Sequence, residues 1–368
     1  MGRLQSNNQR TLTKWIENPV RILNNYGNTG IGDFGTQLIT HWKDLDDSLT
    51  WEVTNDQGEK FMSQILRIIT DKNAIITNVG LTGWGKSGVR NFLGFLGIAI
   101  HQVVGRKTIV LAHHAIETFA PEETGYTITT LTKFGAHLAL KLLKHCDLVV
   151  FNPALEQVLQ IEYQITPSLV VPLPSKPCVA LPSWESVPPV VAMLGYWAPY
   201  KGIDIFLEAA KALREEARWV LAGKPHRVLF KTPEFKQKVS RWETMAREVG
   251  VELPGYVTEQ RLSTLFGGRA VGVLPYTSMS GSSASFATFA ERGVPVVASD
   301  MPEFRFLADL GAGLVLVPPE AKKLEEEVHA LLSNRNRWEE LAWKQLQFSQ
   351  TYSWAQFVRQ LETIAREP

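Results

Sequence analysis

The stretch that decides the fold is VVAMLGYWAPYKGID, residues 190–204. An apolar run leads into Gly195, Pro199 then makes a tight turn, and Lys201 stands just before a helix-like segment. This order predicts a buried strand, a short loop and the start of a helix. An ammonium group at that place, together with the free amides of the helix start, suits a phosphate. Taken alone, Lys201 fits a solvated lysine better than a ligand-binding one.

The residues that follow alternate between helix-length and strand-length segments. Helices are expected at 202–216, 235–250 and 261–268, and apolar strands at 217–225, 270–276 and 294–300. This alternation is typical of βαβ units around a parallel sheet. The final segment, 353–368, spaces its apolar residues along one helical face and therefore needs a surface to pack on.

The first half of the chain shows the same alternation, with apolar runs near residue 20 and at 74–79, 108–114 and 147–152. Between the halves, seven prolines fall within residues 166–191. A proline-dense stretch cannot continue a helix or a central strand, so it predicts a last strand followed by a linker. We expect one α/β domain over 1–185, a second over 186–350, and a C-terminal helical segment over 351–368.

Length and composition exclude several classes of protein. The chain has 368 residues, which suggests about two domains. Its 38 basic and 37 acidic residues create no overall field that would gather nucleic acid. Two cysteines, Cys146 and Cys178, are too few for a disulfide framework. The polar N-terminus lacks a secretory signal, and the most apolar stretch, 92–100, is far shorter than the roughly 20 residues of a membrane-spanning helix. We expect a cytoplasmic protein.

A serine-rich loop follows the strand at 270–276. The segment PYTSMSGSSASF, residues 275–286, surrounds Gly281 with Ser and Thr residues and then becomes helix-like. Backbone N–H groups at a helix start and serine hydroxyls can hold a diphosphate without a positive side chain. The alternative is a serine-rich cap of an ordinary helix.

Three loops of the first half also stand out. NNYGNTGIGDFG, residues 24–35, contains Gly30 and Gly32, which let the backbone approach a ligand closely, although a flexible turn explains them equally well. His113 and His114 end a strand at the expected ligand edge, but an isolated histidine is more often structural, and neighbouring residues of a strand face opposite ways. GLTGWGKSG, residues 80–88, fits the phosphate-binding P-loop pattern. No second strand of the first half ends in a magnesium-binding Asp, so a P-loop nucleoside triphosphatase is only a third interpretation.

The order of the motifs resembles the retaining, nucleotide-sugar-dependent glycosyltransferases of family 4, of the group 1 type. GYWAPYKGID is similar to the "GR…P.KG.D" loop of that family, and LAGKP, GYVTEQRLSTLF, GVLPYTS, RGVPVVASDMPEF and GAGLVLVPPE follow in family order. NTGIGDF, LAHHAIE and CDLVVFNP match more loosely in the first half. The resemblance implies the GT-B fold. That fold has two Rossmann-like α/β domains facing a central cleft, with the C-terminal helix crossing back to the N-terminal domain.

The resemblance also implies an activity. A hexose would pass, with retention, from a UDP- or GDP-sugar such as UDP-glucose or GDP-mannose to a hydroxyl of a glycan, lipid-linked or small-molecule acceptor, in polysaccharide or glycoconjugate biosynthesis. The first domain would bind the acceptor and the second the donor, with no metal and no other cofactor. Lys201 and His113 are then the catalytic candidates. The donor-binding candidates are Gly30, Gly32, Gly195, Tyr196, Lys201, Tyr256, Ser280, Gly281, Ser282, Ser283, Ala284 and Thr288.

Three positions depart from the family pattern. Tyr196 stands where the family usually has Arg, and Ser280 and Thr288 stand where it has paired glutamates that contact the donor sugar and the ribose. Neutral hydrogen bonds contribute about 1 kcal/mol and charge-assisted ones about twice that. The departures therefore leave open a glycosyltransferase-like subunit that is catalytically weak or inactive.

One helical segment suggests a membrane contact. TKFGAHLALKLLKH, residues 132–145, places Lys133, Lys141 and Lys144 beside an apolar stripe, as in helices that lie on anionic lipid. A solvated face of an ordinary helix is the simpler alternative. The expected partners are thus a nucleotide-sugar donor and a glycan or lipid-linked acceptor, with peripheral contact to the inner face of the membrane as an open option and no nucleic acid.

Overall fold

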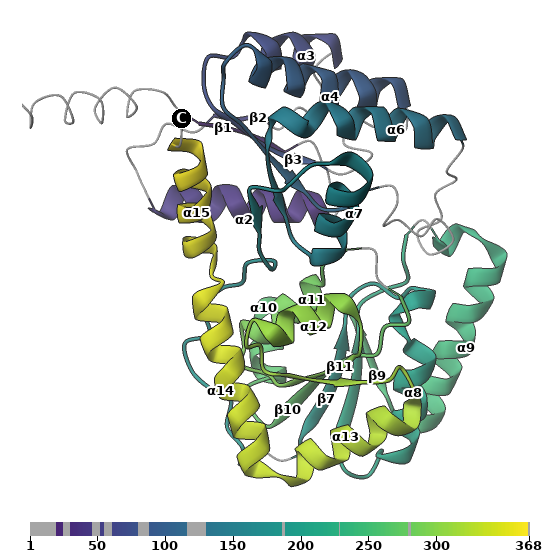
Figure 1. The fold of residues 1–368 in the computed structure, drawn as a ribbon. Coiled ribbons are helices and arrows are strands. Elements are labelled where there is room, and N and C mark those ends of the chain that lie inside the picture. Colours follow the sequence, from purple (N-terminus) through teal and green to yellow (C-terminus); the bar gives the residue numbers. More distant parts are fainter. Residues whose placement is uncertain are drawn as a thin grey trace, which may run out of the picture. The chain divides into compact units, whose positions relative to one another are not determined.

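The described part of the chain forms two α/β units (Figure 1). The structure is a computed structural model and describes residues 20–24, 30–45, 52–54, 61–79, 88–115, 130–185, 188–227, 229–278 and 281–366. The first unit comprises the described residues up to Val171 together with the C-terminal helix from Trp354, and the second runs from Pro172 to Ser353.

The first unit is built on a six-stranded parallel sheet with the order β2-β1-β3-β4-β5-β6. Its strands are β1 (Arg21–Asn24), β2 (Glu52–Thr54), β3 (Ile75–Val79), β4 (Thr108–Ala112), β5 (Asp147–Val150) and β6 (Leu169–Val170). All five residues of β4 are buried, as expected of a strand that is covered on both faces. The helices are α2 (Gly30–Leu45), α3 (Phe61–Thr70), α4 (Gly88–Val103), α6 (Thr130–Leu142), α7 (Pro153–Tyr163) and α15 (Trp354–Arg366).

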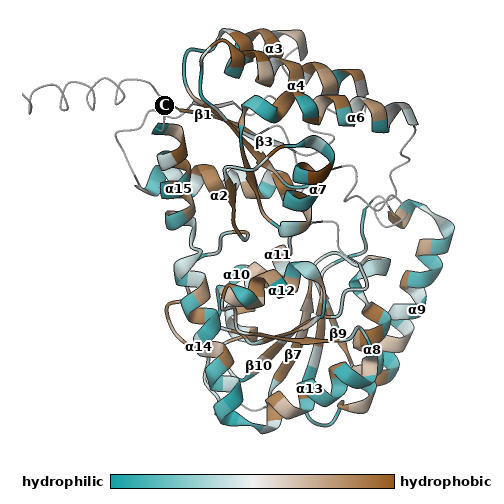
Figure 2. Cartoon of the chain, viewed as in Figure 1, coloured by the Kyte–Doolittle hydropathy of each residue, from teal (hydrophilic) through white to brown (hydrophobic). Residues whose placement is uncertain are grey.

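The second unit has its own six-stranded parallel sheet, in the order β12-β11-β10-β7-β8-β9. The central strands are almost entirely apolar, and Figure 2 shows β7 and β10 in brown. The strands are β7 (Val190–Leu194), β8 (Arg218–Ala222), β9 (Glu252–Gly255), β10 (Ala270–Leu274), β11 (Val296–Ser299) and β12 (Leu314–Val317). The helices are α8 (Ile203–Ala212), α9 (Pro233–Val249), α10 (Glu259–Leu265), α11 (Ala284–Ala290), α12 (Pro302–Asp309), α13 (Ala321–Ser333) and α14 (Arg335–Thr351).

The proline-rich linker packs on the second unit. The backbone N–H of Ser183 donates to the carbonyl of Gly267 (3.2 Å), and that of Cys178 donates to the Ser349 hydroxyl (2.9 Å). The second unit therefore begins at Pro172, earlier than the boundary at 185/186 expected from the sequence. Proline density marks where regular structure ends, but it does not show which side the linker packs on.

The C-terminal helix α15 belongs to the first unit, as predicted for this fold. Its Trp354 ring lies 5.0 Å from the ring of Phe34 on α2 and stacks on His41 at 5.3 Å. Phe357, one turn further on, contacts Phe34 and Phe151. The apolar face read from the sequence thus closes the core beside α2.

None of the helices within the described ranges has both the length and the apolar character that crossing a membrane requires.

Candidate functional site

The second sheet has a topological switch point between β7 and β10. These strands are neighbours, paired at Val190 and Ala270, but the chain leaves β7 toward β8 and leaves β10 toward β11 on the opposite side. In open parallel sheets, ligands bind in the crevice that such a reversal leaves at the carboxyl ends of the strands. Here the loop after β7 and the loop after β10 lie at that edge of the sheet.

The loop after β7 depends on glycine at two places. Gly195 has φ +112°, and a Cβ there would stand 2.9 Å from the Ser285 hydroxyl, which donates to the carbonyl of Leu194 (2.9 Å). Gly202 has φ +69°, and a Cβ there would stand 1.8 Å from the carbonyl oxygen of Pro275. Only glycine allows the two loops to approach this closely.

Lys201 lies between these glycines and reaches across to the other loop. Its Nζ donates to the Tyr276 hydroxyl at 2.5 Å and lies 3.8 Å from the centre of the same ring. Burial lowers the pKa of Lys201, but the hydroxyls of Tyr276 and Tyr200 more than offset this, so its pKa is raised. The site therefore holds a positive charge at the switch point at neutral pH.

The serine loop leads into α11 beside this ammonium. Ser283 caps the helix, because its hydroxyl accepts from the N–H of Phe286 at 3.2 Å, and it also lies 3.4 Å from the Tyr276 hydroxyl. Gly281 and Ser282 are half-buried just before the cap, and Ala284 is the first helical residue. The Thr288 hydroxyl, one turn later, donates to the carbonyl of Ala284 at 3.0 Å. Ser280 lies outside the described residues.

Two exposed tyrosines stand at the ends of β7 and β9. Tyr196 is 43% exposed and Tyr256 is 56% exposed, and their ring centres are 5.8 Å apart. His226 lies 6.0 Å from Tyr196, and the Lys224 ammonium lies 5.4 Å from the Tyr256 ring centre. Tyr196 thus presents an exposed aromatic ring at the position where the family usually has Arg.

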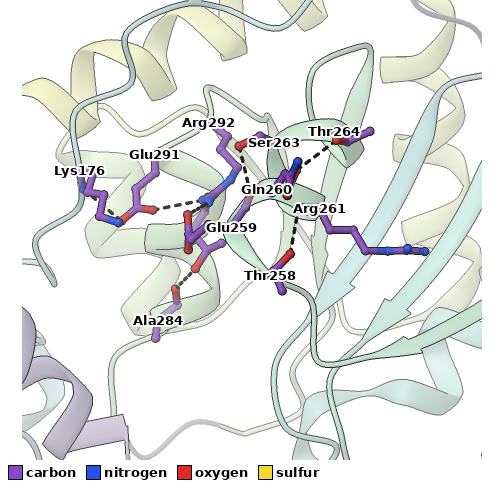
Figure 3. A network of polar contacts seen from close by, with 11 residues as sticks. Lys176, Thr258, Glu259, Gln260, Arg261, Ser263, Thr264, Ala284, Glu291 and Arg292 are labelled. Carbon is purple, nitrogen blue, oxygen red and sulfur yellow. Dashed lines mark hydrogen bonds and ion pairs between the residues drawn. The ribbon is translucent and has the colours of Figure 1, made fainter.

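Ion pairs at the far end of α11 hold this helix in place (Figure 3). Arg292 is largely buried and pairs with Glu259 of α10 at 2.6 Å and with Glu291 at 3.1 Å. Glu291 also accepts from the backbone N–H of Lys176 in the linker (3.1 Å). The position of the serine loop is therefore supported from α10 and from the linker.

In the first unit, the predicted residues gather around Asn78 at the end of β3. Gly30 begins α2 and Gly32 is buried in its first turn. The Asn78 side-chain NH2 donates to the carbonyl of Ile31 (2.6 Å), and the Asn78 side-chain oxygen accepts from Nε2 of His113, 2.6 Å away. This arrangement assigns the Nε2–H tautomer to His113.

His113 is a neutral, packed side chain. Its ring stacks on Phe151 at 4.8 Å and meets the edge of Phe34 at 5.0 Å. Burial, and secondarily the neighbouring His114, lower the pKa of His113 to about 3. A catalytic role for His113 stays a prediction, and its geometry is that of a neutral hydrogen-bond donor rather than of a proton carrier near pH 7.

The P-loop-like segment Gly80–Ser87 lies outside the described residues. It connects β3 to α4, and the neighbours of β3 are β1, which ends at Asn24, and β4, which ends at Ala112. Neither adjacent strand ends in the Asp that a magnesium-dependent triphosphatase requires.

The structure brings together the candidates Gly195, Lys201, Ser283 and Ala284, and it adds two residues that sequence reasoning missed. Tyr276 stands two positions after β10, and Glu303 lies in the first turn of the helix that follows β11; places just beyond the carboxyl ends of strands are a weak signal for a ligand site. Their proximity to Lys201 and to the serine loop depends on how α11 and α12 pack on the sheet.

Comparisons with known proteins identify a family pattern in the second unit. Residues 188–334 match the family described as glycosyl transferases group 1. A search of curated protein sequences finds no match.

Solved structures show the fold. HepE of Anabaena with UDP and glucose superposes with a TM-score of 0.68 at 13% identity, covering 95% of this chain and 100% of that one. Sucrose-phosphate synthase of Thermosynechococcus elongatus gives a TM-score of 0.67 at 15% identity, with 95% and 98% coverage. A glycosyltransferase of Rickettsia africae gives 0.67 at 13% identity, with 96% and 100% coverage.

The chain thus has the GT-B fold of these glycosyltransferases, and its residues 188–334 carry the pattern of glycosyl transferases group 1, as the motif order predicted.

Proposed function

We propose that the chain is a glycosyltransferase that takes a hexose from a nucleotide diphosphate sugar. The observation that carries this proposal is the Lys201 ammonium, held by Tyr276 at the switch point of the segment that matches group 1 glycosyltransferases. A diphosphate is the natural ligand for a buried ammonium beside a glycine turn and a serine loop.

The proposed donor is a UDP- or GDP-sugar. Structures of HepE contain UDP, UDP with glucose, or UDP-glucose, which supports a UDP-sugar as the first donor to test. The rings of Tyr196 and Tyr256 are nearly perpendicular (85°), so one would stack on the planar base and the other would meet its edge, on the side of the site away from β10. A glycine-bordered diphosphate site between that base and the serine loop would then place the sugar near Ser282 and Ser283.

The proposed reaction proceeds with retention and without a metal ion. As the bond between the sugar and the diphosphate breaks, negative charge grows on the diphosphate, and a preorganised ammonium stabilises it. The departing diphosphate assists removal of the acceptor proton on the same face. In this scheme Lys201 is the catalytic residue.

A second candidate function is a glycosyltransferase-like subunit without catalysis. It is favoured by the uncharged residues Ser280 and Thr288 at the positions of the family glutamates. Thr288 uses its hydroxyl hydrogen within its own helix and offers a ligand only an accepting oxygen.

Slow release of free nucleotide from UDP- and GDP-sugars, measured with and without EDTA, tests the proposal. We expect release that is unaffected by EDTA and that falls about 100-fold or more in Lys201→Ala, the scale of losing one charge-stabilising donor. Lys211→Ala, an exposed lysine on the adjoining helix α8, is the matched control.

Donor binding without release would favour the inactive subunit. If the wild-type protein binds neither nucleotide nor nucleotide sugar, or if Lys201→Ala binds and releases nucleotide like the wild type, the proposal is wrong.

The acceptor side of the proposal is a glycan, a lipid-linked glycan or a small molecule. On α6, Phe134 is 67% exposed and Leu138 is 40% exposed, and Lys133 and Lys141 are exposed beside them. Figure 2 shows hydrophobic and hydrophilic residues side by side along this helix. This mixed surface supports contact with an anionic membrane that carries a lipid-linked acceptor.

A further inference from the structure

Glu303 is a buried carboxyl group beside the serine loop. It occupies the first turn of α12 and is 6% exposed. Its carboxyl accepts from the Ser282 hydroxyl, whereas its Oε2 has no hydrogen-bond partner among the described residues. A buried carboxyl oxygen without a hydrogen-bond partner costs free energy, so the group is retained at a cost to stability.

A small cavity adjoins this carboxyl. Its volume is about 10 Å³, and its polar lining comes from Ser282, Ser283 and Glu303, with Phe286 and Leu307 among the apolar side chains. Such a volume admits about one oxygen atom, as in a water molecule or a ligand hydroxyl. The cavity is therefore a site for a single hydroxyl group rather than for a phosphate.

The protonation state of Glu303 decides whether its carboxyl group can donate a hydrogen bond. Burial raises the pKa of Glu303 to about 8, and the bond from Ser282 offsets this only in part. The side chains of other elements that line the cavity are serine or apolar, and Arg305, on the same segment, is paired with Asp300. The Tyr276 hydroxyl contacts Ser283 and its ring packs on Phe304, next to Glu303, and Lys201 contacts the Tyr276 hydroxyl. Glu303 is thus a neutral acid at pH 7, which can donate one hydrogen bond.

The cavity is linked to the diphosphate site by a short chain of contacts. From Lys201 the contacts run to the Tyr276 hydroxyl (2.5 Å) and on to the Ser283 hydroxyl (3.4 Å), and Ser283 lines the cavity. The loop from Pro275 to Ser283 contains no acidic residue, so Glu303 supplies a carboxyl group that the loop lacks.

We propose that Glu303 is a specificity-determining residue that hydrogen-bonds a hydroxyl group of the donor sugar in this cavity. The inference rests on the proposed function, because it assumes a sugar attached to the diphosphate at Lys201. The sugar hydroxyl accepts from the protonated carboxyl and donates to a neighbouring serine. A site built to hydrogen-bond a hydroxyl discriminates against ligands that lack it, because its own buried polar groups are then left unpaired.

The test compares nucleotide sugars with free nucleotides, using UDP-glucose against UDP and GDP-mannose against GDP, by isothermal titration calorimetry between pH 6.5 and 9. In Glu303→Leu we expect affinity for the nucleotide sugar to fall about fivefold, the value of one neutral hydrogen bond, with affinity for the free nucleotide unchanged. Glu303→Gln keeps an N–H donor and should retain the wild-type affinity at pH 7.

The pH profile distinguishes a Glu303 carboxyl that binds the sugar from one that only stabilises the fold. In the wild-type protein the preference for nucleotide sugar over free nucleotide should decline as the pH rises through about 8. In Glu303→Gln the preference should not change with pH. Glu234→Gln is the matched control, because Glu234 also follows a proline in the first turn of a helix but is exposed.

Glu303→Leu removes a buried polar group, so its thermal midpoint should not fall below that of the wild type. The inference is overturned if Glu303→Leu binds nucleotide sugar like the wild type, if it loses nucleotide and nucleotide sugar equally, or if the preference rises with pH. If Lys201→Ala loses nucleotide binding and any of these three results is also obtained, the inference about Glu303 is wrong but the proposed function stands. If the wild-type protein binds no nucleotide, the proposed function is wrong as well.

Discussion

Tyr276 helps to keep the buried Lys201 ammonium charged. The Tyr276 side chain is fully buried, and its hydroxyl accepts from the lysine ammonium. Burial lowers the pKa of Lys201, and Tyr276 opposes this through its charge interaction and its hydrogen bond, with a further contribution from Tyr200. The charge at the switch point is therefore a property of the pair rather than of the lysine alone.

We expect Tyr276→Phe to move the alkaline limb of nucleotide release to lower pH, because Lys201 then loses its proton more easily. A pH–rate profile from pH 6 to 10 measures this, and Tyr352→Phe, a tyrosine outside the site, is the control. An unchanged alkaline limb would show that the tyrosine hydroxyl does not keep the lysine charged.

His113 and His114 should make the first unit sensitive to acid. Burial lowers their pKa values to about 3 and about 4, below the ordinary 6.5. Between the lowered pKa values and about pH 6.5, the two histidines bind protons in the unfolded chain but not in the folded one. The free energy of unfolding therefore falls as the pH drops below about 6.5.

The gap in free energy of unfolding between the wild type and His113→Gln should narrow as the pH is lowered from 7 to 4, because only the wild type loses the His113 contribution. Urea titrations at several pH values measure the gap. If it stays constant, His113 is not held neutral in the folded state.

At the scale of elements, the candidate site depends on how closely the loops after β7 and β10 approach each other. Gly202 ends the short turn before α8, in contact with the Pro275 carbonyl. The serine loop, in turn, has its place because α11 is tied to α10 and to the linker through Arg292 and Glu291.

Gly202→Ala should lower the free energy of unfolding by about 3 kcal/mol, because it adds a steric clash to an unfavourable backbone conformation. Gly250→Ala is the control: Gly250 has a similar φ of +80° but open space around it, so it should lose only about 1 kcal/mol. Equal losses, measured by denaturant unfolding, would show that the loop contact is unimportant.

For the molecule as a whole, the surface of α6 bears on whether the protein contacts a membrane. The helix α6 contains no acidic residue, and neither Lys133 nor Lys141 forms an ion pair within the described ranges. Such a surface is complementary to anionic lipid, to which each lysine contributes about 1 kcal/mol.

We expect the protein to float with vesicles of phosphatidylcholine and phosphatidylglycerol but not with phosphatidylcholine alone. Lys133→Glu/Lys141→Glu should reduce binding about tenfold or more, whereas Lys231→Glu/Lys236→Glu, on the second unit, should not. Equal flotation of the two double variants would leave α6 as an ordinary solvated helix.

The sequence by itself determined the two α/β units, the helical C-terminus and the position of Lys201. These features depend on local patterns: buried parallel strands are continuous apolar runs, amphipathic helices repeat every 3.6 residues, and a glycine turn after a strand marks the ligand edge. The motif order around Lys201 also led to the family that residues 188–334 match.

Only the tertiary structure decided which residues surround that lysine. Tyr276 lies 75 positions from Lys201 in the chain, and the Glu303 carboxyl, in the first turn of α12, meets Ser282, just before α11. Likewise, the tautomer of His113 depends on Asn78 of another strand. Burial and the hydrogen-bond partners of a group set its pKa, and they exist only once strands distant in sequence lie side by side. The charge states of the site therefore depend on tertiary packing, whereas the order of its strands, loops and helices can be predicted from the sequence.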